Sequence, residues 1–144
     1  MLHARILVWT SVFLIATGAA QAASEPKQIK VQHILISFAG TPVQKPLKRT
    51  KADAEKLANE LLKKAQQKGT DFGKLVKENT DDSAPGIYGM LNFGESEKPG
   101  YYFRQGMVPA FGDVGFKLKV GEIGLASFDP TKSPFGYHII KRVE

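Results

Sequence analysis

The sequence has no cysteine and is poor in histidine and tryptophan, with three and one among 144 residues. The lack of cysteine excludes a disulfide framework, a thiolate metal site, a cysteine nucleophile and a lipid-anchored cysteine. The rest of the composition, 42% hydrophobic and 24% charged, is ordinary for a globular protein and excludes a wholly disordered or fibrous chain. A chain of this length provides one domain.

Long hydrophobic runs are also lacking, apart from one at the amino terminus. Residues 6–20 are mostly apolar, follow a start that carries Arg5, and lead into the small-x-small pattern Ala20-Gln21-Ala22. These are the parts of a secretory signal peptide. We predict a cleavable signal at 1–22 and a periplasmic or secreted protein. A membrane anchor is the alternative, but the run is near the lower limit of the ~17–25 residues that a spanning helix needs.

Nothing after the signal is apolar enough to span a bilayer, so no stable membrane insertion is expected once it is removed. The formal net charge is +6, and loss of Arg5 with residues 1–22 lowers it by one to +5. This mild excess predicts a solvated surface with weak attraction to anionic partners. No helical segment combines clustered basic residues with aromatics, so nucleic acid is not expected as a partner.

The hydrophobic periodicity predicts strands and helices in the order β-α-α-β-α-β-β, after a short polar lead at 23–30. Strands are expected at 31–38, 90–93, 126–128 and 135–143, and helices at 50–67, 70–78 and 109–118. The clearest helix begins at Thr50, a candidate N-cap with Asp53 three residues later. The first and last strands are the most apolar and should lie side by side. We therefore predict an α+β domain at 31–144, with helices on an antiparallel sheet.

Two histidines follow the predicted signal, His33 in the first strand and His138 in the last. If those strands are neighbours, the two imidazoles can meet inside the sheet. Each could equally be a core histidine with a satisfied hydrogen bond. A pair without further ligands is a poor zinc site, which needs three or four, so we predict no metal and no cofactor.

Five segments in chain order resemble the parvulin family of peptidyl-prolyl cis/trans isomerases. They are residues 31–36 (VQHILI), 80–83 (TDDS), 103–111 (FRQGMVPAF), 120–123 (VGEI) and 135–140 (FGYHII). The resemblance covers 31–144. It implies a four-stranded antiparallel sheet wrapped by helices, the parvulin (FKBP-like) fold, and rotation about X-Pro bonds in proline-containing polypeptide substrates.

The resemblance also implies a pocket for the prolyl ring. Met107 and Phe111 would form it, helped by Leu91 and Phe116. The residues themselves leave a plainer interpretation open. Met107 and Phe111 are four apart and could make an ordinary core contact on one helix, and Leu91 and Phe116 could also be core.

A polar group beside the pocket is implied as well. Asp82, His33 and His138 would form a hydrogen-bonded network that shapes the site, and Ser133 would supply a hydroxyl that orients one histidine. Asp82 could instead simply cap a turn. We assign proton transfer to none of these residues.

The chain departs from the family pattern next to this site. A Gly-Asp-Leu-Gly-like stretch of the family reads Gly89-Met90-Leu91-Asn92 here, and an extra segment at 95–102 follows it. Tyr101 and Tyr102 in this segment could contact substrate or cover the sheet edge. Val108 stands where a glutamine is common. One family branch binds phosphoserine through a basic loop. The spacing of Lys45, Lys48 and Arg49 does not match it, so we interpret 39–49 as a solvated loop.

The implied reaction needs no nucleophile. The X-Pro barrier of about 18–20 kcal/mol arises from amide resonance, and an apolar site that prefers the twisted amide lowers it. We predict a monomeric isomerase that acts on exported or folding proteins. The alternatives are a non-catalytic peptide-binding chaperone module and a subunit-interaction domain, which would form a stable oligomer.

Overall fold

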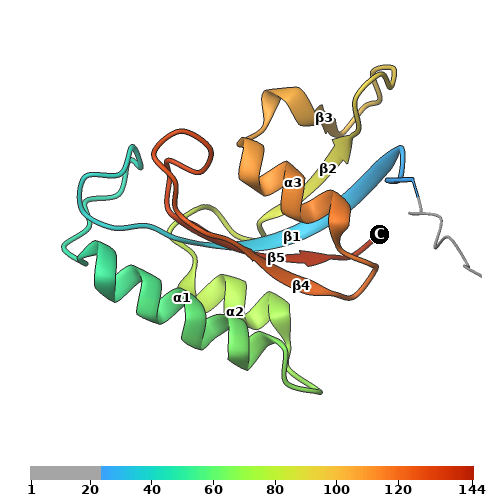
Figure 1. Ribbon diagram of the computed structural model, residues 1–144. Helices are drawn as coiled ribbons and strands as arrows, with labels where there is room; N and C mark the ends of the chain where they lie inside the picture. The colour runs from blue at the N-terminus through green and yellow to red at the C-terminus, as the bar shows by residue number, and fades with distance from the viewer. Residues whose placement is uncertain (1–23) are drawn as a thin grey trace, which may run out of the picture.

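A computed structural model describes residues 24–144 (Figure 1). The predicted signal peptide at 1–22 therefore lies outside the described residues. The elements are β1 (Gln28–Ile36), α1 (Lys51–Ala65), α2 (Phe72–Asn79), β2 (Ile87–Leu91), β3 (Tyr101–Phe103), the 3-10 turn η1 (Arg104–Gly106), α3 (Pro109–Lys117), β4 (Ile123–Ala126) and β5 (Tyr137–Arg142). No helix within 24–144 is long and apolar enough to cross a membrane.

Strand β1 lies at the centre of one sheet. Within residues 24–144 the strands follow the order β3-β2-β1-β5-β4. Both neighbours of β1 run antiparallel to it, and the register sets His33 opposite Ile140 and Leu35 opposite His138. Helices α1 and α2 cover one face of the sheet and α3 covers the other (Figure 1). The predicted α+β class and the pairing of the first and last strands are confirmed.

The prediction of four strands, all antiparallel, was wrong in detail. The sheet has a fifth strand, β3, which comes from the extra segment and runs parallel to β2 at its edge. Three residues are too few to show an alternating pattern, so this strand could not be predicted from periodicity. The position of β3 beside β2 requires a glycine at 89, because a Cβ there would lie 2.8 Å from the Tyr101 ring.

Element boundaries differ from the prediction by a few residues. β1 begins at Gln28, inside the segment expected as a polar lead, and ends at Ile36. β2 and β4 each begin three residues earlier than expected, at Ile87 and Ile123. The β1 extension pairs with β2 as far as Gln28, opposite Leu91.

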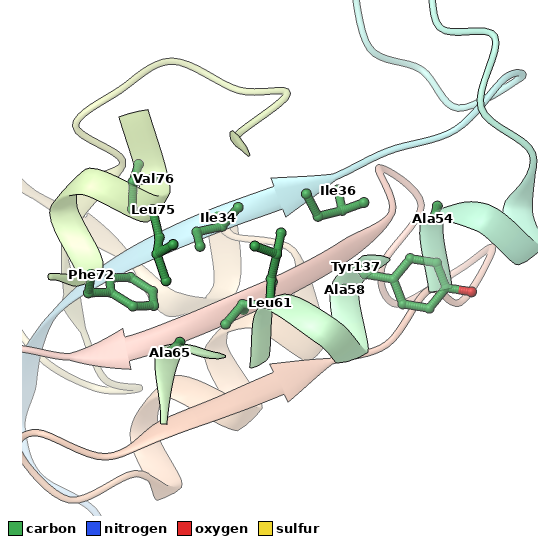
Figure 2. Close-up of a cluster of buried hydrophobic side chains, with 11 residues drawn as sticks. Ile34, Ile36, Ala54, Ala58, Leu61, Ala65, Phe72, Leu75, Val76 and Tyr137 are labelled. Atoms are coloured by element: carbon green, nitrogen blue, oxygen red, sulfur yellow. The ribbon is translucent and has the colours of Figure 1, made fainter. Parts of the chain in front are cut away.

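Period-two alternation in β1 divides the core between the two faces. Ile34 and Ile36 pack with α1, α2 and β5 residues in one cluster (Figure 2), whereas Ile29 and Val31 pack under α3 in a second. Helix α1 begins as predicted, because the Asp53 amide donates to Thr50 Oγ1 at 3.1 Å. Alternate residues of a strand face opposite sides, so the odd-numbered β1 residues, His33 among them, belong to the α3 side.

Helix α3 lies close to the sheet and is fixed at both ends. Gly115 makes the close approach possible, because a Cβ there would meet the Met90 methyl at 3.1 Å and Ile29 at 3.2 Å. At its start, the Ala110 amide donates to the Lys132 carbonyl in the β4–β5 loop at 3.0 Å. The first turn of α3 is therefore held above the middle of β1 and β5.

Arg104, just after β3, ties the extra segment to the domain. Its guanidinium lies between the rings of Phe93 and Phe116, at 4.8 and 4.6 Å from their centroids. It also donates to Glu25 at 2.6 Å and to Asp113 at 2.9 Å. The side chain is only 8% exposed, so this cation is enclosed by partners.

Candidate active site

His33 and His138 meet on the α3 face of the sheet, as their strand positions predicted. Their Nδ1 atoms are 3.3 Å apart, and their rings stack with centroids 5.4 Å apart at 19°. Both side chains are buried. Neighbouring central strands thus bring together two imidazoles that are 105 positions apart in the sequence.

Asp82, in the turn after α2, joins the pair from the solvent side. Its Oδ2 lies 3.2 Å from His33 Nε2 and accepts the Tyr88 hydroxyl at 3.2 Å. The hydrogen bond from His33, opposed by burial, is the main reason that the pKa of Asp82 falls from 3.8 to about 2; the Ser83 amide and Tyr88 add to it. Asp82 is therefore a carboxylate at neutral pH. Burial and the nearby Asp82 carboxylate raise the pKa of Tyr88, so its hydroxyl remains a donor.

The carboxylate fixes which ring nitrogen of a neutral His33 carries the proton, and through it the tautomer of His138. An ionised carboxylate can only accept, so His33 Nε2 carries the proton of that hydrogen bond. In neutral His33 the Nδ1 atom is then an acceptor, and His138 must donate to it from Nδ1. This leaves His138 Nε2 as a bare lone pair, and that atom is buried without a hydrogen-bond partner among residues 24–144.

Burial keeps His138 neutral. Burial is the main cause that lowers the pKa of His138 from 6.5 to about 3, and the nearby His33 lowers it further. The Asp82 carboxylate opposes this shift. Protonation would add an unpaired buried N–H at Nε2, which costs more than an unpaired acceptor lone pair. The chain Asp82–His33–His138 therefore has a carboxylate at its outer end and a neutral imidazole, His138, at its buried end.

Phe111 and Met107 stand next to this network. The Phe111 ring contacts both imidazoles edge-on, at centroid distances of 5.1 Å to His33 and 5.4 Å to His138. Phe111 is buried and Met107 is partly exposed. Both line a cavity of about 590 Å³ that also includes His33, Asp82 and His138. Five of the eight residues that the sequence assigned to the site therefore share one cavity.

Leu91 and Phe116, expected to help bind the prolyl ring, do not line this cavity. Phe116 is buried in the core under α3 and against the Arg104 guanidinium. Leu91 is buried on β2, next to Met90, which packs toward α3. Because neighbouring strand residues face opposite sides, Leu91 points away from the cavity. Both positions fit the core role that the sequence also allowed.

Ser133 does not hydrogen-bond to either histidine. Its hydroxyl donates to the Gly136 carbonyl at 2.9 Å, and its amide donates to the Asp129 carbonyl at 2.9 Å. It is fully buried. Ser133 therefore holds the loop that leads into β5, and it acts on His138 only through the backbone.

Tyr88 belongs to the site and was missed by the sequence analysis. It lines the cavity, donates to Asp82, and contacts the His33 ring edge-on at 5.3 Å. The available signal was its place two residues before Met90 on the same strand. That spacing puts both side chains on the α3 face, but the expected strand began at Met90 and left Tyr88 out.

The loop at 39–49 forms another wall of the cavity through Pro42, Val43, Gln44 and Lys45. Asp81 secures it. This carboxylate is 2% exposed and accepts from Arg49 at 2.6 Å and Lys45 at 3.3 Å, as well as from the Ser37 amide at 2.9 Å. Two of the loop's basic residues are thus paired with a buried carboxylate within the protein.

Comparisons with known proteins agree with this geometry. The family model described as a PPIC-type PPIase domain matches residues 17–144. A parvulin-like PPIase of Rickettsia bellii is 34% identical over 119 residues, covering 82% of this chain and 33% of the relative. Foldase protein PrsA of Bacillus subtilis is 37% identical over 92 residues, covering 63% and 27%. The chain thus spans about a third of the length of the curated relatives it matches.

Solved structures show a similar fold. A peptidyl-prolyl isomerase from Candida albicans aligns with a TM-score of 0.64 at 20% identity, covering 82% of this chain and 63% of that one. At this identity the likeness concerns the fold alone.

Proposed function

The chain belongs to the PPIC-type, or parvulin, family of peptidyl-prolyl isomerase domains, and on that basis we propose that it catalyses cis–trans isomerisation of X-Pro bonds in exported polypeptides. The observation that carries the proposal is the contact between Phe111 and both buried imidazoles at the wall of an open cavity. There the apolar ring of Phe111 is in direct contact with the polar network.

The reaction needs this combination. Resonance keeps the X-Pro amide planar, and only contacts that are stronger in the twisted amide lower the barrier. Met107 and Phe111 hold the prolyl ring and exclude water, and the flexible thioether adapts to the ring as it turns. The Asp82–His33–His138 chain supplies a preorganised electrostatic environment for the carbonyl side of the bond. No step requires proton transfer.

The site has no need of a covalent intermediate. Asp82 is held ionised by two donors to one oxygen, and this fixes the orientation of His33 and, through it, His138. The three groups therefore act as a rigid wall against which the amide rotates. Ser133 supports that wall by holding the loop before His138.

Export is the second part of the proposal. It is supported by the predicted signal peptide at 1–22, and a relative named as a foldase supports folding polypeptides as the substrates. The substrates are then polypeptides that fold after crossing a membrane, and the domain acts on them as a monomer. Cleavage after Ala22 would be seen directly as a new amino terminus at Ala23 in protein recovered from the periplasm or medium.

Isomerase activity is tested by NMR exchange spectroscopy on a blocked Ala-Ala-Pro-Ala peptide with the full-length chain. We expect the wild type to broaden cis and trans resonances, and Met107→Ala to lower kcat/KM about tenfold, as loss of transition-state contact requires. Val120→Ala is the matched control, because Val120 is 63% exposed in the turn before β4. Peptide binding without faster exchange would instead favour a non-catalytic chaperone module.

A further inference from the structure

The row of aromatic rings in the cavity continues beyond it. Phe111 lies 6.0 Å from Tyr88, and Tyr88 lies 5.9 Å from Tyr102, centroid to centroid. Tyr102 is 57% exposed and belongs to β3, in the segment that the family pattern lacks. One of its neighbours is therefore a cavity residue, and most of its ring faces solvent.

The two tyrosines of β3 have different surroundings. Tyr101 packs over Gly89 and under the Lys98 ammonium, which is 4.2 Å from its ring centroid. Tyr102 pairs in register with Met90, so its side chain is on the α3 side, as are Met90 and Tyr88. Tyr101 thus has a packing role that accounts for it, whereas the exposed ring of Tyr102 contributes little burial to the fold.

We propose that Tyr88 and Tyr102 form an aromatic subsite beside the prolyl cavity that binds an aromatic or large aliphatic side chain of the polypeptide substrate. This inference rests on the proposed function and specifies its substrate class. The exposed apolar surface continues the established cavity, so a peptide seated there with its proline against Phe111 meets the Tyr102 ring as it leaves.

The distances between the ring centroids limit which substrate residue can contact Tyr102. Extended chain advances about 3.3 Å per residue. Each of the two centroid steps, 6.0 Å and 5.9 Å, is less than two residues long. The side chain that contacts Tyr102 is therefore within about four positions of the proline.

The charge near the subsite disfavours an acidic side chain. The Tyr88 hydroxyl is committed to Asp82, so what the subsite offers is ring surface, whereas the Asp82 carboxylate repels an acidic residue. Aromatic side chains gain from such ring contacts beyond their area, and unfolded polypeptides expose them. An enzyme with this subsite would select proline bonds near residues that will be buried when the substrate folds.

The test uses a peptide series and the full-length chain. The reference peptide is Ala-Ala-Ala-Ala-Pro-Ala-Ala-Ala-Ala with blocked ends, and phenylalanine, glutamate or arginine replaces alanine at each position in turn. Two quantities are measured for every peptide: kcat/KM by exchange spectroscopy and Kd by NMR titration. We expect phenylalanine to improve both by about two- to tenfold at one position, and to exceed arginine and glutamate there.

The variants locate the effect. Tyr102→Ala should bring the ratio of the phenylalanine peptide to the reference peptide close to one, Tyr102→Phe should keep it, and Val120→Ala should leave it as in the wild type. A preference that survives Tyr102→Ala, an arginine preference, or no preference at any position overturns the subsite.

Failure of the subsite and failure of the proposed function give different results. If the reference peptide is isomerised but phenylalanine gives no advantage, the subsite alone is wrong. If no peptide is isomerised, the proposed activity is wrong, and the Kd ratios still decide whether Tyr102 binds an aromatic side chain.

Discussion

The Oδ2 atom of Asp82 lies 3.2 Å from Nε2 of His33, so a turn on the surface and a buried strand meet through one carboxylate oxygen. This contact holds Asp82 ionised and orients the His33 ring. It also makes the protonation of Asp82 a measurable part of stability, because its pKa in the folded protein is about 2, below the ordinary 3.8.

The stability that Asp82 contributes should be present above about pH 4 and lost as the pH falls through 2. The unfolded chain takes up the proton first, which favours unfolding in this window. Since 34% of the side chain is exposed, solvent screening limits the effect to about 1 kcal/mol. Denaturant unfolding of wild type and Asp82→Asn should differ by this amount at pH 5 and converge near pH 2. A difference that is independent of pH would contradict the assignment.

His138 should produce a separate loss of stability at higher pH. Its pKa is lowered from 6.5 to about 3 by burial, so between these values only the unfolded state is protonated. The unfolding free energy should therefore fall by up to about 1.4 kcal/mol per pH unit below pH 6.5. His138→Gln, which does not titrate, should flatten the profile between pH 7 and 5. Parallel profiles for the two proteins would show that folding leaves the pKa of His138 unchanged, and would contradict the assignment.

Asp81→Asn should loosen the cavity wall at 39–49. It removes the charge that pairs with Arg49 and Lys45, at a cost of about 2–3 kcal/mol for a buried charged hydrogen-bond group. Amide exchange of Ala39, which donates to the Arg49 carbonyl at 2.9 Å, should become faster. Lys45→Ala is the comparison: Lys45 is 58% exposed, and its loss should cost under about 1 kcal/mol. Equal effects of the two changes would rule out Asp81 as the anchor.

Arg104→Ala should destabilise the domain by about 2–3 kcal/mol. The change removes two ring contacts and the charged hydrogen bonds to Glu25 and Asp113. Arg104→Lys should recover only part of the loss, because a single ammonium cannot contact both rings and both carboxylates as the guanidinium fork does. Thermal and denaturant unfolding measure the stability of both Arg104 variants. Lys117→Ala, at an exposed position on α3, is the control. If lysine replaces arginine at no cost, the stacking has no energetic role.

The parts of the fold that the sequence predicted are those set by local pattern. Thr50 and Asp53 are a capping pair that needs no tertiary context, and the apolar spacing that follows identified α1. The first and last strands were placed together because both are apolar on two faces, as central strands are. The motif segments then identified five of six residues that line the cavity beside the hydrogen-bonded network, namely His33, Asp82, Met107, Phe111 and His138, and missed Tyr88.

The rest depended on contacts between distant segments. β3 exists because Gly89 leaves room for Tyr101, a relation between two residues that no periodicity reveals. Leu91 was assigned to the pocket by resemblance alone, because the face of the sheet to which its side chain points follows only from the register of β2 with β1. Asp81 is next to Asp82 in the sequence, yet one carboxylate anchors a loop and the other joins the histidines. The backbone conformation of the turn directs the two side chains to these different partners, and the sequence alone does not reveal it.

Pairing of β1 with β5 also determines when the site can exist. A nascent chain leaves the ribosome with β1 long before β5, and until Tyr137–Arg142 emerges the central strand has one open edge and His33 has no partner ring. Closure across so many residues gives a high contact order and slow folding. Until β5 arrives the histidine pair cannot form, and the open edge of β1 can pair with a strand of another chain.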